Sequence, residues 1–277
     1  MEKKKKGSWS TVLLIIILIT GLSLMLYPTV AEAWNARFRN RAIAAYSEGV
    51  ANLDDGRYDE IWNDAKTYNK SLVERYNQYK LEDEQKERYD SLLNISGTGT
   101  MGYIEIPAIN CALPIYHGTD ETVLQVAVGH LEWTSLPTGG DSTHCVLSGH
   151  RGLPSAKLFT DLDKLTVGDH FMLRILNETL TYEIDQILIV LPNETGDLLI
   201  QEGKDLCTLV TCTPYGVNSH RMLVRGHRVA NDRVSVEVRV TSDAIQVEPM
   251  LVAAVVGVPV LMGMLLVIFL FDRIRKR

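Results

Sequence analysis

A cysteine and an arginine lie on either side of a short turn in this chain. The segment reads Thr208-Leu-Val-Thr-Cys212-Thr-Pro-Tyr-Gly-Val-Asn-Ser-His-Arg221, an apolar run that ends at the cysteine and returns through a Pro/Gly/Asn turn. This pattern predicts Cys212 and Arg221 on neighbouring strand ends, where a thiolate acts as a nucleophile and a guanidinium stabilises an oxyanion. A strand-end cysteine is also often a small buried hydrophobe, so the assignment depends on partners.

The best partner is a histidine in Val146-Leu-Ser-Gly-His150-Arg-Gly152, where a glycine stands on each side of the His-Arg pair. The glycines let the backbone turn sharply and predict an imidazole at a strand end. Histidine is suited to move protons near neutral pH, although a loop histidine that caps a carbonyl is the alternative. Among the other histidines, His130 has the most similar setting; the rest are His117, His144, His170, His220 and His227.

Two further arginines follow Arg221 on the same predicted strand. Arg225 has the same strand parity as Arg221, so both side chains can point to one face. Arg221 comes directly after the turn and is therefore expected closer to Cys212. A guanidinium there can donate two hydrogen bonds to carbonyl oxygens. For Arg225 and Arg228 we expect structural ion pairs.

The remaining cysteines, Cys111, Cys145 and Cys207, have apolar neighbours, which predicts core positions. An even number of cysteines permits two disulfides, but a domain of this size can bury a core without them. Cys207 and Cys212 are five residues apart, so a regular strand points them to opposite faces. No histidine pair has zinc-site spacing and Cys212 lacks a Cys-x-x-Cys partner, so neither a metal nor a cofactor is expected.

The elements that must position these residues are short strands. From Met101 onward, β-rich runs alternate with turn signals such as Gly139-Gly140 and Gly168-Asp169. Many short strands with such punctuation indicate a mainly β fold, a closed or partly closed barrel. The predicted strands are Gly102–Ile106, Ala112–Tyr116, His144–Ser148, His170–Ile175, Leu180–Leu191, Cys207–Thr211, Met222–Arg228 and Val234–Val240.

Ahead of the β-rich region, residues 32–94 contain no proline and show apolar residues at helical spacing. One amphipathic helix is predicted over Trp34–Val50 and a second over Ile61–Tyr76. Asn52-Leu-Asp-Asp-Gly56 is predicted to be the break between them, because it lacks the spaced oxygen ligands of a calcium loop.

Uncharged apolar runs lie near both ends. Thr11–Leu26 follows the basic residues Lys3–Lys6, and the 22-residue run Met250–Phe271 precedes a basic tail. About 20 apolar residues span a bilayer, and basic flanks favour the cytoplasmic side. The N-terminal run is predicted to be an uncleaved anchor, and a signal peptide cleaved after Ala33 is the alternative. Either reading places the middle of the chain outside the cell membrane.

The charge distribution agrees with an exported domain. The formal net charge is −6, and residues 1–10 and 272–277 contribute +3 each, so the remainder carries −12. An acidic domain argues against a nucleic-acid partner, because phosphate binding needs a basic face.

Taken together, several motifs resemble the sortases of Gram-positive bacteria, most closely class C, the pilin-polymerising group. The resemblance covers about residues 100 to 230, and a C-terminal membrane segment is also typical of class C. The motifs are Thr208–Cys212, Ser148-Gly-His150-Arg-Gly-Leu, Arg221-Met-Leu-Val-Arg-Gly-His-Arg228, Gly102-Tyr-Ile-Glu-Ile-Pro107, Leu113-Pro-Ile-Tyr-His-Gly118, Gly129-His-Leu-Glu132, Thr134-Ser-Leu-Pro137 and Leu153-Pro-Ser-Ala-Lys-Leu-Phe159.

The resemblance implies a cysteine transpeptidase in which Cys212 is the nucleophile, His150 the general acid/base and Arg221 the residue that orients substrate and stabilises the oxyanion. Its partners would be pilins or surface proteins that carry a Leu-Pro-x-Thr-Gly-type sorting signal ahead of a C-terminal apolar run. The acyl group would pass through a thioester to a pilin lysine amine, in keeping with covalent catalysis by an activated thiol. A housekeeping sortase that uses a peptidoglycan cross-bridge amine is the alternative.

The sequence departs from class C in one respect. Class C sortases usually carry an Asp-Pro-aromatic lid, whereas no proline lies between Pro28 and Pro107. Tyr76 or Tyr79 could cover the site instead, but core packing is the expected role.

Leu136-Pro-Thr-Gly-Gly140 is predicted to be a turn. A wall-anchored surface protein is disfavoured, because no sorting motif precedes Met250.

The expected organisation places the catalytic domain on the extracellular face of the cell membrane. The whole chain is expected to comprise a basic N-terminus with a membrane segment or signal peptide (1–30), a helical region (31–98), a sortase-type barrel of about eight strands (99–242), a linker (243–249), a transmembrane helix (250–271) and a basic cytoplasmic tail (272–277).

Overall fold

The computed structural model describes residues 9–74, 79, 81 and 83–231 of the 277-residue chain. The predicted strand Val234–Val240, the linker, the apolar run Met250–Phe271 and the basic tail lie outside the described residues.

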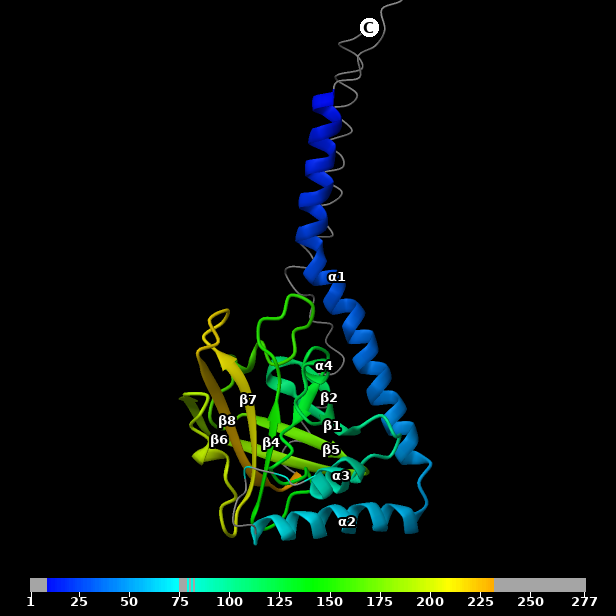
Figure 1. The fold of residues 1–277 in the computed structure, drawn as a ribbon, viewed down its shortest axis with the longest axis vertical. Helices are drawn as coiled ribbons and strands as arrows, with labels where there is room; N and C mark the ends of the chain where they lie inside the picture. The colour runs from blue at the N-terminus through cyan, green and yellow to red at the C-terminus, as the bar shows by residue number, and fades with distance from the viewer. Residues whose placement is uncertain (1–8, 75–78, 80, 82, 232–277) are drawn as a thin grey trace, which may run out of the picture.

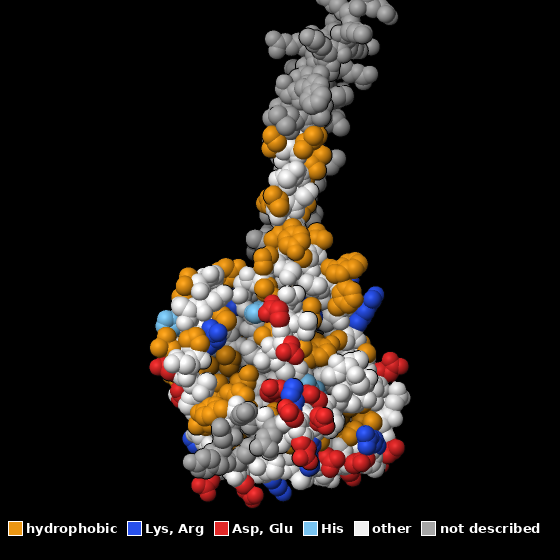
Figure 2. Space-filling view, in the orientation of Figure 1, with side chains coloured by type: hydrophobic (Ala, Val, Ile, Leu, Met, Phe, Trp, Pro, Cys, Tyr) orange, Lys and Arg blue, Asp and Glu red, His pale blue; other side chains and the backbone are white. Residues whose placement is uncertain are grey.

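A single long helix, α1 (Trp9–Ala51), carries the N-terminal apolar run and continues along the side of the barrel (Figure 1). Within the described residues it is the one helix long and apolar enough to cross a membrane. Figure 2 shows hydrophobic side chains along the part that projects beyond the barrel. The helix passes Ala31–Ala33 without a break, so the amphipathic segment predicted from Trp34 is a continuation of the apolar one.

The lower part of α1 is fixed to the barrel by buried contacts. The Tyr46 hydroxyl donates to the carbonyl of Met101 at 2.8 Å and accepts from the Leu176 amide at 2.7 Å. Tyr46 and Val50 form a small apolar cluster with Leu176. Buried hydrogen bonds of this kind fix both partners, because an unmade one leaves a desolvated polar group.

Two further helices close the base of the molecule. α2 (Asp55–Val73) crosses beneath the barrel, and α3 (Asp83–Ser91) follows (Figure 1). Asp54 begins α2 as its N-cap and accepts a hydrogen bond from the Arg57 amide at 2.8 Å. The acidic segment Asn52–Gly56 is therefore a helix connection and cap, as predicted.

Eight strands close into one barrel in the order β1-β2-β3-β4-β7-β8-β6-β5. The mainly β fold class is confirmed. The pairs β2/β3 and β4/β7 are parallel, and the other neighbours are antiparallel. The strands are β1 (Thr100–Ile106), β2 (Cys111–His117), β3 (Val128–His130), β4 (Thr143–Ser148), β5 (His170–Ile175), β6 (Glu178–Val190), β7 (Asp205–Thr213) and β8 (His220–Val229).

Seven of the predicted strands correspond to observed ones, with ends that shift by up to two residues. β3 is not among the strands predicted from the sequence, because three residues are too few to show an alternation of apolar and polar side chains. β3 nevertheless completes the barrel, since it joins β2 to β4.

Candidate active site

Three neighbouring strands bring the predicted catalytic residues to one level of the barrel. In the parallel pair β4/β7, Ser148 lies opposite Val210, and the Gly149 amide extends this ladder by donating to the Val210 carbonyl at 3.0 Å. His150 and Cys212 directly follow Gly149 and Thr211, which are hydrogen-bonded to each other. On the other side of β7, Cys212 is paired directly with Arg221 of β8. The register therefore places Cys212 beside Arg221, and the turn after β4 brings His150 to the same end of β7.

Cys212 and Arg221 also share the outer face of the barrel. Cys207 and Leu209 pack in the interior core, whereas Val210 packs in a separate cluster on the outside. Because side chains alternate along a strand, Cys212 points outward with Val210. This outer apolar cluster flanks Cys212 along β7 and its neighbours; it comprises Val146, Leu198 and Leu223, with Leu131, Trp133, Leu188, Val190 and Val210 packed around them.

The turn that carries His150 is held from both sides. The Thr211 hydroxyl, next to Cys212, donates to the Gly149 carbonyl at 2.8 Å. Arg151 donates to the Thr213 hydroxyl at 3.2 Å and pairs with Asp163 at 2.5 Å. The hydrogen bonds thus attach the residues that flank His150 to the residues that flank Cys212.

Glycine is required at positions 149 and 152 for two different reasons. A Cβ on Gly149 would lie 2.7 Å from the Phe159 ring, so only glycine permits this close packing. Gly152 has φ +81°, a left-handed conformation that side chains disfavour. The sharp turn predicted from the sequence is therefore present.

The His150 side chain lies near a carboxylate that the sequence did not single out. Its Nε2 is 3.7 Å from Glu121 Oε2, at the start of the short helix α4 (Glu121–Leu124). Nε2 is buried and has no hydrogen-bond partner among the described residues. A half-buried imidazole with an uncommitted nitrogen can accept and donate a proton. Glu121 is 29 positions from His150 in the sequence, and no local pattern marks it.

Arg221 and Arg225 differ, as expected, in whether a carboxylate neutralises the guanidinium. Arg221 is half-buried, donates only to the carbonyls of Asn218 and His220 at 3.2 Å, and has no carboxylate partner within the described residues. Arg225 forms a two-pronged ion pair with Asp185, at 2.9 and 3.1 Å, which confirms its structural role. Arg228 has no ion pair within the described residues; it donates to the Thr179 carbonyl and stacks over the Tyr182 ring.

The other cysteines are free thiols without a catalytic setting. Cys145 and Cys207 face each other inside the barrel, and burial raises the pKa of Cys207 well above its usual value. Cys111 packs against the core but is only half-buried, so its assignment as a core residue holds in part. Burial raises the pKa of Cys111 to about 12, which keeps it a thiol at neutral pH.

The alternative histidine, His130, is a buried structural residue. Its Nδ1 lies 2.9 Å from the Tyr89 hydroxyl and its Nε2 lies 2.8 Å from the Ser135 carbonyl, so both nitrogens are occupied. This arrangement fits one neutral tautomer, in which Nε2 donates to the carbonyl. His130 therefore has no free nitrogen to exchange a proton with a substrate.

Two other features of the sequence also have a place in the structure. The Leu136–Gly140 segment is a turn, tied to α2 by Asn69, whose side chain bonds both the amide and the carbonyl of Leu136. Tyr79 is 47% exposed and packs edge-on against Trp133 of the outer apolar cluster. The core role expected for Tyr79 is therefore wrong, because its ring lies on the outer face. Tyr76 falls outside the described residues.

Comparison with known proteins agrees with this geometry. Residues 104–229 match the sortase domain family. The solved sortase C1 of Streptococcus agalactiae is 58% identical with a TM-score of 0.68, and the match covers 69% of this chain and 100% of that one. The chain belongs to the sortase family. Sortases are cysteine transpeptidases, so this chain is an enzyme of that kind.

Other similar structures place the chain in class C. The sortase C of Streptococcus pneumoniae, whose structure addresses pilin substrate specificity, is 43% identical, with a TM-score of 0.63 and coverage of 69% and 97% of the two chains. The sortase C of Clostridium perfringens, solved with the C-terminal cell wall sorting motif, is 45% identical, with a TM-score of 0.61 and coverage of 69% and 98%.

The curated relatives are more distant. Sortase D of Bacillus subtilis is 35% identical over 131 residues, which are 46% of this chain and 63% of sortase D. The match therefore spans less than two thirds of that relative's length.

Proposed function

We propose that this sortase is a membrane-anchored transpeptidase that cleaves Leu-Pro-x-Thr-Gly-type sorting signals between Thr and Gly and transfers the acyl group to a pilin lysine amine. The observation that carries the proposal is the pairing of Cys212 with Arg221 on the outer face, beside an apolar surface, with the turn that carries His150 hydrogen-bonded to the same strand. The class C neighbours favour pilin polymerisation over attachment to peptidoglycan.

Cys212 acts as the nucleophile in the first half of the reaction. Its thiolate attacks the threonine carbonyl, and Arg221 donates hydrogen bonds to the oxyanion that forms. His150 gives a proton to the amine of the departing glycine as the amide bond breaks. The product is a thioester between Cys212 and the threonine, and the segment that begins with glycine leaves.

The second half returns the enzyme to its starting state. The acceptor lysine attacks the thioester carbonyl as a neutral amine, and His150 takes the proton that this nitrogen loses as the new C–N bond forms. Arg221 again stabilises the oxyanion, and the C–S bond then breaks as the Cys212 thiolate leaves. An isopeptide bond between two pilins results. Water in place of the amine would give hydrolysis through the same steps.

The surroundings of Cys212 suit the apolar part of a sorting signal. Val210 and Leu223 of the outer apolar cluster lie two residues from Cys212 and Arg221 along their strands. Apolar side chains gain free energy when they leave water for such a surface. The leucine and proline of the signal would bind here and place the threonine carbonyl at the thiol.

We also propose that α1 stays attached as a membrane anchor and that residues 99–242 form the catalytic unit outside the membrane. Glu32 of α1 accepts a hydrogen bond from the Lys157 amide at 2.7 Å, and Asn35 donates to the Ser155 carbonyl at 2.8 Å. Cleavage after Ala33 would remove the first of these contacts.

The experiment that tests the function uses the full chain in detergent micelles with a sorting-signal peptide. Mass spectrometry is expected to detect a thioester adduct that disappears in Cys212→Ala. Adding a pilin that carries its acceptor lysine, or in parallel a peptidoglycan cross-bridge amine, then identifies the acceptor. The absence of an adduct with every sorting-signal variant would overturn the proposal, and consumption of the adduct only by the cross-bridge amine would assign the housekeeping role.

A further inference from the structure

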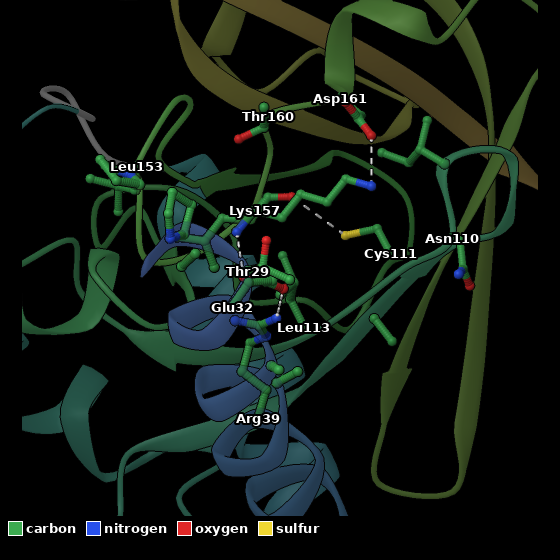
Figure 3. Close-up of a pocket in the computed structure, with 18 of the residues that line it drawn as sticks. Thr29, Glu32, Arg39, Asn110, Cys111, Leu113, Leu153, Lys157, Thr160 and Asp161 are labelled. Atoms are coloured by element: carbon green, nitrogen blue, oxygen red, sulfur yellow. Dashed lines mark hydrogen bonds and ion pairs between the residues drawn. The ribbon is translucent and has the colours of Figure 1, made fainter. Parts of the chain in front are cut away.

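A cavity of about 600 Å³ lies beside the catalytic residues, between α1 and the barrel (Figure 3). Its size is within the range of ligand sites. One wall is the face of α1 from Pro28 to Asn40, and the others are the β1–β2 connection, the loop after His150 and Tyr215. The catalytic machinery described above does not use it.

One end of the cavity adjoins both catalytic loops. Leu153 comes three residues after His150, and Tyr215 comes three residues after Cys212; both line the cavity. The two loops touch here, since a Cβ on Gly152 would lie 2.9 Å from the Tyr215 ring. A chain that leaves Cys212 on this side can therefore pass directly into the cavity.

The other end points along α1 toward its apolar run. Pro28 and Thr29 line the cavity, and the uncharged run Thr11–Leu26 ends two residues before Pro28. The cavity thus leads from the catalytic loops to the level at which α1 is expected to enter the membrane.

Arg39, which lines the cavity, carries a buried hydrogen-bond donor without an acceptor among the described residues. Arg39 is only 7% exposed and pairs through Nη2 with Glu32, while its Nη1 has no partner among the described residues. Figure 3 shows Arg39 and Glu32 at the cavity wall, with Glu32 also holding the Lys157 amide. A buried donor left unpaired costs free energy, so it marks a place where a ligand oxygen would be stabilised.

The charges on the cavity wall indicate a neutral oxygen as the ligand. Arg39 is balanced by Glu32, and Lys157 lies 2.9 Å from Asp161. With its charges matched, the wall does not select an anion such as a phosphate. A peptide carbonyl is the neutral acceptor that fits one unpaired N–H group, and Ile109, Leu113 and Leu153 supply apolar contacts for side chains.

From this geometry, and resting on the proposed function, we propose that the cavity binds the substrate segment that follows the cleaved Thr-Gly bond, with Arg39 donating to one of its backbone carbonyls. A sorting signal is followed by its own apolar run, so this segment must lead from Cys212 to the membrane. The cavity follows the same direction.

Binding of this segment should affect the acylation step and not the transfer step. The segment after the cleaved bond is present while the thioester forms and has left before the amine attacks. Contacts to it therefore contribute to kcat/KM for acylation and leave the transfer step unchanged.

The test compares two peptides with the full chain in nanodiscs. Both carry the same sorting signal; one ends at the glycine after the cleaved bond, and the other continues with the residues that follow in a pilin. Thioester formation on Cys212 is followed by mass spectrometry. We expect kcat/KM to be about tenfold higher for the longer peptide, the size of one or two hydrogen bonds and some apolar contact.

Variants of α1 locate the effect. Ala33 is exposed and lines the cavity, so Ala33→Trp should fill its mouth and bring the ratio of the two kcat/KM values close to one. Ala44→Trp is the matched control, because Ala44 is exposed on the same helix outside the cavity, and it should keep the wild-type ratio. Arg39→Lys keeps a charge for Glu32 but removes Nη1, and should lower the ratio about fivefold.

A wild-type ratio near one would overturn the proposal, and so would an unchanged ratio in Ala33→Trp. Loss of rate for both peptides alike in Ala33→Trp would also overturn it, since the cavity would then support the fold or hold another occupant. In each of these cases the shorter peptide still forms a thioester, so the proposed function survives. Failure of both peptides to acylate the wild-type chain would instead remove the proposed function.

Discussion

β4 and β7 carry two pairings of similar residues, one inside the barrel and one at its edge. In the interior, Cys145 lies opposite Cys207, and His130 is buried nearby on β3 with both ring nitrogens occupied. Where the same two strands end, the turn with His150 is hydrogen-bonded to the residue before Cys212, and His150 Nε2 has no hydrogen-bond partner among the described residues. The interior and the strand ends thus carry the same residue types, but they differ in exposure to solvent and in whether the histidine has an uncommitted nitrogen.

The two settings differ in whether they favour a reactive thiolate. In the interior, burial raises the pKa of Cys207 and opposes its thiolate, so this cysteine behaves as a small apolar residue. At the strand ends the backbone turns away, and a cation stands next to the thiol. The reactivity proposed for Cys212 follows from its place near the end of a strand and from its neighbours on the adjacent strand and turn.

The largest expected effect separates the two cysteines of β7. Cys212→Ala should lower transpeptidation by a factor on the order of 10⁴ or more, because the nucleophile is lost. Cys207→Ala should keep kcat within about threefold and reduce the free energy of unfolding by about 1 to 2 kcal/mol, through a small interior cavity. Peptide turnover and urea unfolding measure both. A Cys207→Ala variant that folds but is inactive would break the distinction.

The next effect separates two arginines that share a face of β8. Arg221→Ala should slow thioester formation by about 10² to 10³, the usual cost of a lost oxyanion donor. Arg225→Ala should leave acylation within about threefold and lower stability by about 1 kcal/mol, since it removes the pair with Asp185. Single-turnover acylation and thermal unfolding provide the comparison. Equal rate losses in both variants would contradict the assignment of Arg221.

The smallest effect concerns a buried histidine of β4. His144 bonds Leu199 and Thr208, and burial lowers its pKa below the usual value. The unfolded chain therefore binds a proton that the folded chain does not, so stability should fall as the pH drops from 7 to 5. His144 contributes at most about 1.4 kcal/mol per pH unit. Urea unfolding across this range should show a weaker pH dependence in His144→Gln, and an unchanged slope would refute its role.

The sequence predicted what local patterns encode. Apolar runs that end in a cysteine or a glycine-flanked histidine located Cys212 and His150 correctly at strand ends, and the position directly after a turn distinguished Arg221 from Arg225. Their adjacency required the order of strands in the barrel, which no local pattern contains. β3 was omitted from the strands because three residues are too short for a visible alternation.

Contacts between distant segments were also beyond local patterns. Glu121 near His150 and the contacts of Glu32 and Asn35 with the loop after His150 join positions 29 to 125 residues apart. Arg228 looked like an ion-pair residue, and its stacking on Tyr182 depends on the β6/β8 register. Such features arise from tertiary packing, where propensity and spacing carry no information.

We propose that Cys212, and no interior cysteine, becomes acylated by the sorting signal. The most direct measurement is to trap the reaction of the wild-type chain with a sorting-signal peptide, digest it at low pH and locate the added mass. We predict that the acyl group ends in threonine and is found only on the fragment that contains Cys212. Acylation of a fragment that carries Cys111, Cys145 or Cys207, with Cys212 unmodified, would contradict the account.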